Sequence, residues 1–310
     1  MASATCNVCF RACLLEEGQT GVCFARGNRD GKIVPVNYGL LTSLALDPIE
    51  KKPLNRFMQG KKVLSVGTFG CNLKCAFCQN CEISQARLMP SASGPFVTDA
   101  APGEAFRVQF TSPEGMSYAV PVEHYTPDDL LHLALTHRAK SNIGMAFTYN
   151  EPLVGFEFVR DTARLIHEAG MKNVLVTAGC VSRQVLEEVL PYIDAMNIDL
   201  KSFRPSFYES VCRGNLHMVK SFIETAAAHC HVELTTLIVP GENDSEAEIR
   251  EIAGWIASLN GGTGTEIPYH ISRFFPRYRM NDRRPTDVEH IFRLADVARE
   301  KLKYVYTGNC

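Results

Sequence analysis

From about residue 126 onward, the sequence alternates short apolar runs with longer amphipathic stretches, and this alternation constrains the fold more than any other feature. Short runs rich in β-branched residues predict strands, and apolar residues at every third or fourth position predict helices. The predicted strands, including one earlier run, are Val63–Thr68, Met145–Tyr149, Asn173–Thr177, Ala195–Leu200, Val232–Val239 and Tyr269–Phe274. The predicted helices are Asp128–Ala139, Val154–Ala169, Ser182–Leu190, His217–Ala228, Ser245–Leu259 and Asp287–Leu302.

Repeated strand–helix units with right-handed crossovers build a parallel sheet. Six such units predict an α/β fold in which the sheet curls into a partial (β/α)6 barrel. Residues of the capping type, Thr126, Ser245 and Thr286, stand where three of the helices are predicted to begin. In barrels of this kind, functional residues lie at the carboxyl ends of the strands.

The predicted barrel occupies residues 61–310 and follows a cysteine-rich segment at residues 1–60. An insertion at about residues 88–122 is rich in Pro, Gly, Ser and Ala and has no helical period. Its weakly alternating runs at 106–110 and 116–122, separated by a turn sequence, predict a short β-hairpin. A long insertion of this kind is either a lid over a site or a disordered excursion.

The overall charge and hydropathy of the 310-residue chain exclude several classes of protein. A formal net charge of −2 argues against a broadly basic nucleic-acid surface. The first ten residues lack the basic start and apolar core of a secretory signal, and no apolar run approaches the length of a membrane span. We therefore expect a cytoplasmic protein that binds neither nucleic acid nor membrane.

The cysteines are numerous and clustered. Eight of the twelve lie within the first 81 residues, in two tight groups. Disulfide scaffolds concentrate cysteines in short secreted domains, whereas clustered cysteines in a cytosolic chain more often bind metal. The spacing therefore favours metal binding.

The more distinctive group is Cys71, Cys75 and Cys78, which directly follows the first predicted barrel strand. Three cysteines on a tight loop can bind three irons of a four-iron cluster and leave one iron open for a chelating cofactor or substrate. Structural zinc requires a fourth protein ligand, which Cys81 could provide. The position at the end of a barrel strand favours the cluster.

The spacing Cys-x3-Cys-x2-Cys, with an aromatic residue before the last cysteine, resembles the signature of the radical S-adenosylmethionine (SAM) superfamily. The sequences Ile49–Leu54, Gly70-Cys71-Asn72 and Cys78-Gln79-Asn80 resemble its AmmeMemoRadiSam branch, which is related to the pyruvate formate-lyase activating enzymes. The resemblance extends over residues 6–84 and 125–309. It implies a radical-SAM barrel with an N-terminal cysteine knuckle, a [4Fe–4S] cluster, SAM, and an electron donor such as flavodoxin or ferredoxin.

The resemblance also implies which residues would contact SAM. Phe77 would lie against the adenine, the strand-end sequence containing Glu151 would orient the amino group, and Asp199 with Lys201 would contact the methionine or ribose end. Ile238 would flank the adenine. The full set implied is Phe77, Tyr149, Asn150, Glu151, Thr177, Asp199, Lys201 and Ile238.

Two of these assignments have simpler alternatives. Glu151 precedes a proline and can be an ordinary helix N-terminal residue. Asp199 and Lys201 can be a salt bridge at a strand end.

Candidate substrate contacts follow the third and sixth strands. Cys180 comes directly after a strand-end glycine, and His270, Ser272 and Arg273 belong to a sequence that matches the branch closely. A histidine within a strand is more often a hydrogen-bonded structural residue. The chain departs from the branch at Thr177-Ala178-Gly179, where Ala178 replaces the usual asparagine.

The N-terminal group consists of Cys6, Cys9, Cys13 and Cys23. Four cysteines without histidine suit structural zinc or a second iron–sulfur cluster equally. Unligated thiols are the remaining alternative. The resemblance implies a cysteine knuckle here, independent of the catalytic cluster.

We therefore expect an enzyme that reductively cleaves SAM to a 5′-deoxyadenosyl radical, which acts on an unidentified small-molecule or protein substrate. One alternative is activation of a glycyl-radical enzyme. Another is transfer of the 3-amino-3-carboxypropyl group of SAM to a trivalent arsenical, as in arsinothricin-type biosynthesis, because thiols bind soft arsenic. A rival from another class is a non-catalytic zinc-binding interaction module.

Overall fold

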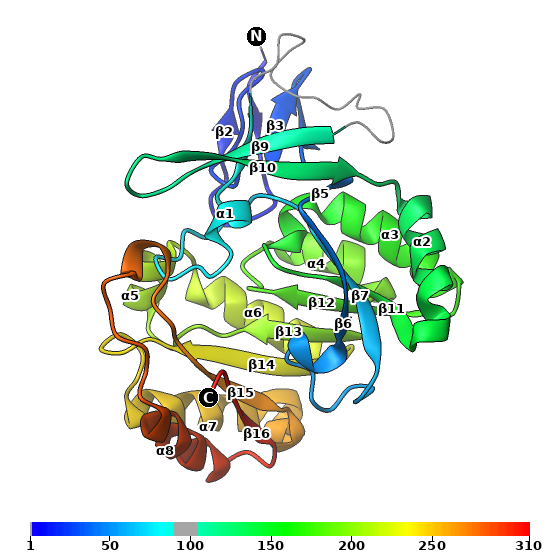
Figure 1. Cartoon of the computed structure of the whole chain (residues 1–310). Coiled ribbons are helices and arrows are strands. Elements are labelled where there is room, and N and C mark those ends of the chain that lie inside the picture. Colours follow the sequence, from blue (N-terminus) through cyan, green and yellow to red (C-terminus); the bar gives the residue numbers. More distant parts are fainter. Residues whose placement is uncertain (1, 90–104) are drawn as a thin grey trace.

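The computed structural model describes residues 2–89 and 105–310, and it is built around one eight-stranded sheet. The strand order is β16-β15-β14-β13-β12-β11-β7-β6, in which every neighbouring pair from β7 to β16 is parallel and only β6 is antiparallel. Helices pack against the outer face of the curled sheet (Figure 1). This arrangement confirms the α/β partial barrel.

The six predicted barrel strands are all present, with ends shifted by at most a few residues. They are β7 (Lys62–Gly67), β11 (Asn142–Phe147), β12 (Lys172–Thr177), β13 (Ala195–Asp199), β14 (His231–Ile238) and β15 (Tyr269–Arg273). The helices between and after them are α2 (Pro127–Thr136), α3 (Phe156–Glu168), α4 (Arg183–Val189), α6 (Leu216–Ala227), α7 (Glu246–Gly262) and α8 (Val288–Arg299).

Two strands extend the sheet beyond the prediction. β6 (Ser43–Pro48) pairs antiparallel with β7, and β16 (Val305–Gly308) adds a parallel strand after α8. Both lie at an edge of the sheet and are only partly buried, so neither shows the burial pattern of an interior strand. Each is held in the sheet by pairing with one neighbouring strand. Apolar patterning alone does not reveal such strands, because their strand conformation depends on that neighbour.

The segment after β6 closes the amino-terminal end of the barrel. Ile49 and Leu54 are fully buried against Val63, Val174 and Ala195, which lie toward the amino ends of β7, β12 and β13. Further along this segment, the backbone amides of residues 55 and 56 donate hydrogen bonds to the buried carboxylate of Glu233 on β14. This segment therefore covers the amino-terminal end of the barrel.

Side-chain caps fix where the helices begin. Thr126 forms a capping box with Asp129 at the start of α2, and Ser245 accepts a hydrogen bond from the amide of Glu248 at the start of α7. The cap of α8 is Asp287 rather than the predicted Thr286. Thr286 is buried and donates its hydroxyl proton to the carbonyl of residue 238 instead.

Smaller sheets lie over the carboxyl ends of the barrel strands (Figure 1). The cysteine-rich segment forms β1 (Ala4–Thr5), β2 (Leu14–Leu15), β3 (Arg26–Arg29) and β4 (Lys32–Pro35). The predicted hairpin is confirmed as β9 (Ala105–Thr111) and β10 (Ser117–His124), flanked by β5 (Leu40–Leu41) and β8 (Arg87–Leu88). The rest of the predicted insertion, residues 90–104, lies outside the described residues.

No helix in the described ranges is long and apolar enough to cross a membrane.

Candidate active site

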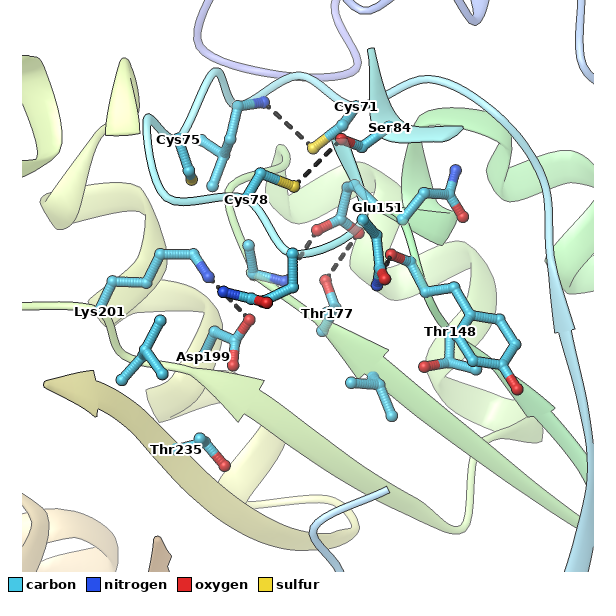
Figure 2. Close-up of a pocket in the computed structure, with 18 of the residues that line it drawn as sticks. Cys71, Cys75, Cys78, Ser84, Thr148, Glu151, Thr177, Asp199, Lys201 and Thr235 are labelled. Carbon is cyan, nitrogen blue, oxygen red and sulfur yellow. Dashed lines mark hydrogen bonds and ion pairs between the residues drawn. The ribbon is translucent and has the colours of Figure 1, made fainter. Parts of the chain in front are cut away.

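A cavity of about 350 Å³ opens at the carboxyl ends of β11 to β14, beneath the loop that follows β7. The thiols of Cys71, Cys75 and Cys78 line one side of it, and Glu151, Asp199 and Lys201 line the other (Figure 2). Segments more than one hundred residues apart in the sequence therefore meet in one place. This is the position at which barrels of this type hold their functional groups.

Backbone contacts to the rest of the chain hold the loop that carries the three cysteines. The amide of Cys71 donates to the carbonyl of Cys23 (3.1 Å), and the amide of Lys74 donates to the carbonyl of Cys212 (2.8 Å). Gly70 has a φ of +88°, and a Cβ at this position would lie 2.5 Å from the Cys23 carbonyl oxygen. A glycine is therefore required for the loop to approach the N-terminal segment.

The three thiols are poorly suited to exist alone as thiolates. Burial raises the pKa of Cys71 well above its usual value, and the negative charges of Glu151 and the other two cysteines raise it further. Burial also raises the pKa of Cys78. A buried charge of this kind needs a positive partner, and thiolate-bound iron supplies one. The donor set therefore fits an iron–sulfur cluster.

Glu151 is almost fully buried, and its carboxylate is fixed by three hydrogen bonds. The Thr177 hydroxyl donates to Oε1 at 2.7 Å, the amide of Ala178 donates to Oε2 at 2.8 Å, and the amide of Leu153 donates to Oε1 at 3.1 Å. Burial raises the pKa of this carboxyl even though these bonds favour its charged form. The donors are all neutral, so the carboxylate can accept a cationic ligand group.

Asp199 and Lys201 lie at the end of β13 and form an ion pair with an O–N distance of 2.8 Å. Burial acts to lower the pKa of Lys201, but Asp199 and Cys75 outweigh it and hold the pKa well above its usual value. The ammonium group lies 6.0 Å from the ring centre of Phe77, which also lines the cavity. Both members of the pair therefore present charge to the cavity while remaining paired.

Three other predicted cofactor contacts line the cavity but also hold its walls. The Asn150 amide donates to the Gly70 carbonyl (2.8 Å) and to the Thr68 hydroxyl (3.0 Å), which anchors the cysteine loop. Tyr149, with a φ of +74°, donates its hydroxyl to Asp47 at 2.7 Å. Thr177 lines the cavity and orients Glu151.

Ile238 and the substrate candidates Cys180, His270 and Arg273 do not line the cavity. Side chains alternate along a strand, so Leu237 and Ser272 face it, whereas the next residues, Ile238 and Arg273, face away. Of the contacts that the resemblance implied on these two strands, Ser272 lines the cavity, whereas Ile238, His270 and Arg273 do not.

The other two substrate candidates are held elsewhere by hydrogen bonds. His270 is buried, and its Nε2 lies 2.6 Å from the Glu233 carboxylate. Cys180 is fully buried, and its sulfur accepts from the amide of Asn215 at 3.4 Å. Both therefore contact the protein interior rather than the cavity.

Cys81, the possible fourth ligand of a zinc site, has different surroundings from the three loop cysteines. It is buried in an apolar cluster with Phe69, Val108 and Phe110 beneath the hairpin. It does not line the cavity. Its position therefore favours three ligands on the loop rather than four.

Several lining residues were not predicted as site residues. Thr148, Thr235 and Ser84 line the cavity (Figure 2). Lys51 and Lys52 also reach it, and both pair with Asp47 on β6. The two lysines belong to the Ile49–Leu54 sequence, which was noted for its resemblance but had no assigned chemistry. Ser84 belongs to a short helix, α1 (Cys81–Ser84), which follows the cysteine loop.

The four N-terminal cysteines line a separate, enclosed cavity of about 10 Å³. Burial raises the pKa of Cys23 to about 11, and the charges of Cys9 and Cys6 add to this shift. In the parts of the chain that the structure describes, no three His, Cys, Asp or Glu side chains are close enough together to bind a single ion. Metal binding here would therefore draw the four thiols together.

Comparison with known proteins is consistent with this geometry. The model of the radical SAM superfamily matches residues 65–253, from β7 into α7. An uncharacterized protein of Methanocaldococcus jannaschii is 36% identical over 306 residues, covering 98% of this chain and 80% of its own length.

More distant relatives include named enzymes. The indoleacetate decarboxylase activating enzyme of Tractidigestivibacter scatoligenes is 24% identical, over 74% of this chain and 86% of its own length. The pyruvate formate-lyase 1-activating enzyme of Escherichia coli is 26% identical, over 47% of this chain and 62% of its own length. The structure of Streptococcus suis SuiB bound to S-adenosylmethionine shares the fold, with a TM-score of 0.52 at 11% identity, over 77% of this chain and 48% of that one. The family match covers more than half of the chain, and the chain is therefore an enzyme that belongs to the radical SAM superfamily.

Proposed function

We propose that the chain binds a [4Fe–4S] cluster through Cys71, Cys75 and Cys78 and cleaves SAM reductively. Membership of the superfamily implies both cofactors. The observation that supports these particular residues is that three thiols and the buried carboxylate of Glu151 line one cavity at the strand ends. When bound, the reduced cluster supplies the electron that splits SAM into methionine and a 5′-deoxyadenosyl radical.

The residues opposite the cysteines would bind and orient SAM. Glu151 accepts the ammonium group of its methionine part, because the carboxylate is buried and held only by neutral donors. Lys201 and Asp199 present one charge of each sign to the carboxylate and ribose. Phe77 offers an apolar face to the adenine. Asn150 and Thr177 keep the loop and Glu151 in place.

Anaerobic incubation of reconstituted protein with dithionite and SAM tests this proposal. We expect iron and sulfide at close to four per chain and release of 5′-deoxyadenosine. Zinc without iron, or an iron–sulfur protein that leaves SAM intact, would overturn it. Release of 5′-methylthioadenosine would instead show that the aminocarboxypropyl group is transferred.

Activation of a glycyl-radical enzyme is the second candidate, and the relatives named as activating enzymes favour it. Such a function requires a protein substrate and a flavodoxin- or ferredoxin-type electron donor. A stable glycyl-radical signal in a partner protein, formed only with SAM and reductant, would support it. Cleavage of SAM without any such partner signal would favour a small-molecule substrate.

Transfer to a trivalent arsenical has less support from the cavity. Among the described lining residues, the only thiols are the three loop cysteines, which the proposed cluster would use. Cys180 and Cys212 are fully buried and do not line it. A soft arsenical would therefore have no free thiol to bind in the cavity.

The N-terminal cysteines form a second proposed site. We propose that Cys6, Cys9, Cys13 and Cys23 bind zinc or a second iron–sulfur cluster with a mainly structural role. Four thiolates complete a tetrahedral coordination sphere and leave no position for a substrate. Support for the site comes from the enclosed cavity that these cysteines share.

A further inference from the structure

Ser84 is a buried hydroxyl that touches one of the three loop cysteines. It is 2% exposed and ends α1, six residues after Cys78. Its Oγ lies 3.2 Å from the sulfur of Cys78, and the two side chains meet at the edge of the cavity (Figure 2). A serine hydroxyl has one proton to donate and two lone pairs that accept.

The direction of this hydrogen bond follows from the neighbouring glutamine. Gln85 Nε2 donates to Ser84 Oγ at 3.1 Å, so the amide occupies an accepting position of the hydroxyl. A thiolate can only accept. The single proton of Ser84 is therefore directed to Cys78 when this cysteine is a cluster ligand.

The orientation of Gln85 is fixed in turn by a cation. Lys74 Nζ donates to Gln85 Oε1 at 2.7 Å, so the carbonyl oxygen faces the lysine and the amide nitrogen faces Ser84. The lysine lies on the cysteine loop, and its ammonium is 4.4 Å from the ring centre of Phe24 in the N-terminal segment. A chain of hydrogen bonds thus runs from a cation through an amide and a hydroxyl to Cys78.

We propose that this chain, Lys74 to Gln85 to Ser84, makes the cluster easier to reduce. The inference rests on the proposed function, since it requires Cys78 to be a cluster ligand. Reduction adds one electron from an external donor, with no bond made or broken and no proton moved along the chain. Hydrogen bonds to cluster sulfurs stabilise the more negative reduced form, and a bond polarised by a cation does so more strongly. Ser84 and Gln85 are positioning residues that act through Cys78.

The first test is the reduction potential of Ser84→Ala, measured without SAM by titration followed by electron paramagnetic resonance. We expect the variant to retain its iron and sulfide and to be reduced only at a more negative potential. Ser84→Thr, which keeps the hydroxyl, is the matched control, and its reduction potential should lie close to that of the wild type. A potential for Ser84→Ala equal to that of the wild type would overturn the proposal.

Lys74→Met is the second variant and preserves the length of the side chain while removing the charge. We expect a shift in the same direction, and Ser84→Ala combined with Lys74→Met should not shift by the full sum, because the cation acts partly through the serine. If the two shifts in reduction potential add fully, Lys74 does not act through Ser84, and the proposed chain of hydrogen bonds is overturned. Failure of the wild-type protein to form any iron–sulfur cluster would instead refute the proposed function, so the two failures are distinguishable.

Discussion

At the scale of single residues, Cys75 and Cys81 are two buried cysteines with different surroundings. Cys75 lines the cavity, and Cys81 lies among apolar side chains beneath the hairpin. We expect Cys75→Ala to abolish SAM cleavage, because one iron loses its only protein ligand. Cys81→Ala is the matched control and should retain the cluster and its spectral change with SAM. A cleavage rate in Cys75→Ala equal to that of the wild type would disprove the ligand assignment.

Glu151→Gln tests the contact proposed for the ammonium group of SAM. The substitution keeps the shape and an accepting oxygen but removes the charge, which is worth about 1.5–3 kcal/mol in a charge-assisted hydrogen bond. We expect SAM to bind roughly ten- to one-hundredfold more weakly to a cluster that still forms. Glu168→Gln, which removes an exposed charge on α3, should bind SAM normally. Unchanged binding by Glu151→Gln, measured through the SAM-induced change in the cluster spectrum, would exclude this role.

At the scale of elements, Glu233 on β14 binds the segment after β6 that covers the amino-terminal end of the barrel, through the backbone amides of residues 55 and 56. Burial acts to raise its pKa, but hydrogen bonds from His231, His270 and these two amides outweigh it and lower the pKa from 4.5 to about 2. Because the pKa of Glu233 is lower in the folded protein than in the unfolded chain, the carboxylate stabilises the fold at pH values above about 4.5. This stabilisation is lost as the pH falls from about 4.5 toward 2. In cluster-free protein, Glu233→Gln should lower the free energy of unfolding at pH 7 by up to about 3 kcal/mol.

Denaturant unfolding at several pH values measures this effect. The deficit of Glu233→Gln relative to the wild type should shrink as the pH falls, because the wild-type carboxylate becomes protonated. Glu266→Gln, at an exposed pair with Lys303, is the control and should change stability little. A deficit that is the same at pH 7 and at pH 3 would contradict the assignment.

The junction between the cysteine loop and the N-terminal segment depends on Gly70. Both Gly70 and Gly241 have positive φ, but only at Gly70 would a Cβ collide with backbone, 2.5 Å from the Cys23 carbonyl. Gly241→Ala should therefore cost only the strain of about 1 kcal/mol. Gly70→Ala should cost more and lower the cluster content at a given iron supply. Equal melting temperatures for the two variants would show that the close approach of Gly70 to the Cys23 carbonyl does not contribute to stability.

The same elements show what the sequence could and could not predict. Strands of the barrel interior are recognisable where burial on both faces demands a continuous apolar run, as in β12. β6 and β16 lie at the edges of the sheet and are only partly buried, so their sequences carry a weaker strand signal. The cysteine loop, Glu151 and the β13 charges were predicted because their chemistry is visible in residue types. Leu237 and Ile238 are both apolar, so the apolar pattern of β14 does not indicate which of the two side chains faces the cavity.

At the scale of the whole molecule, the N-terminal segment is packed into the barrel mouth rather than attached to its side. Its Val8 carbonyl accepts from the amide of Ser182 before α4, and Arg26 pairs with Glu157 on α3 at 2.6 Å. Arg11 bridges the carbonyls of Asn72 and Arg213, at 2.7 Å each. These contacts join the first four strand–helix units of the barrel through a segment with little apolar core of its own.

A metal bound by the N-terminal cysteines would therefore stabilise the whole molecule. We expect the double variant Cys9→Ala/Cys13→Ala to melt at a lower temperature and to lose one metal equivalent, because metal binding replaces a core in ordering this short segment. The cluster at Cys71–Cys78 should still form and bind SAM, since its own ligands are intact. Metal analysis, thermal unfolding and SAM binding on the same preparations provide the measurement.

The alternatives for these four cysteines give different results in that experiment. An unchanged melting temperature and metal content would show that the four are free thiols. A variant that stays folded and binds SAM but no longer turns over would show that the site relays electrons, which the backbone contact between Cys23 and Cys71 makes geometrically feasible. Loss of stability with a normal turnover number for the surviving folded protein is the result expected of a structural site, because a closed four-thiolate sphere supplies rigidity and no chemistry.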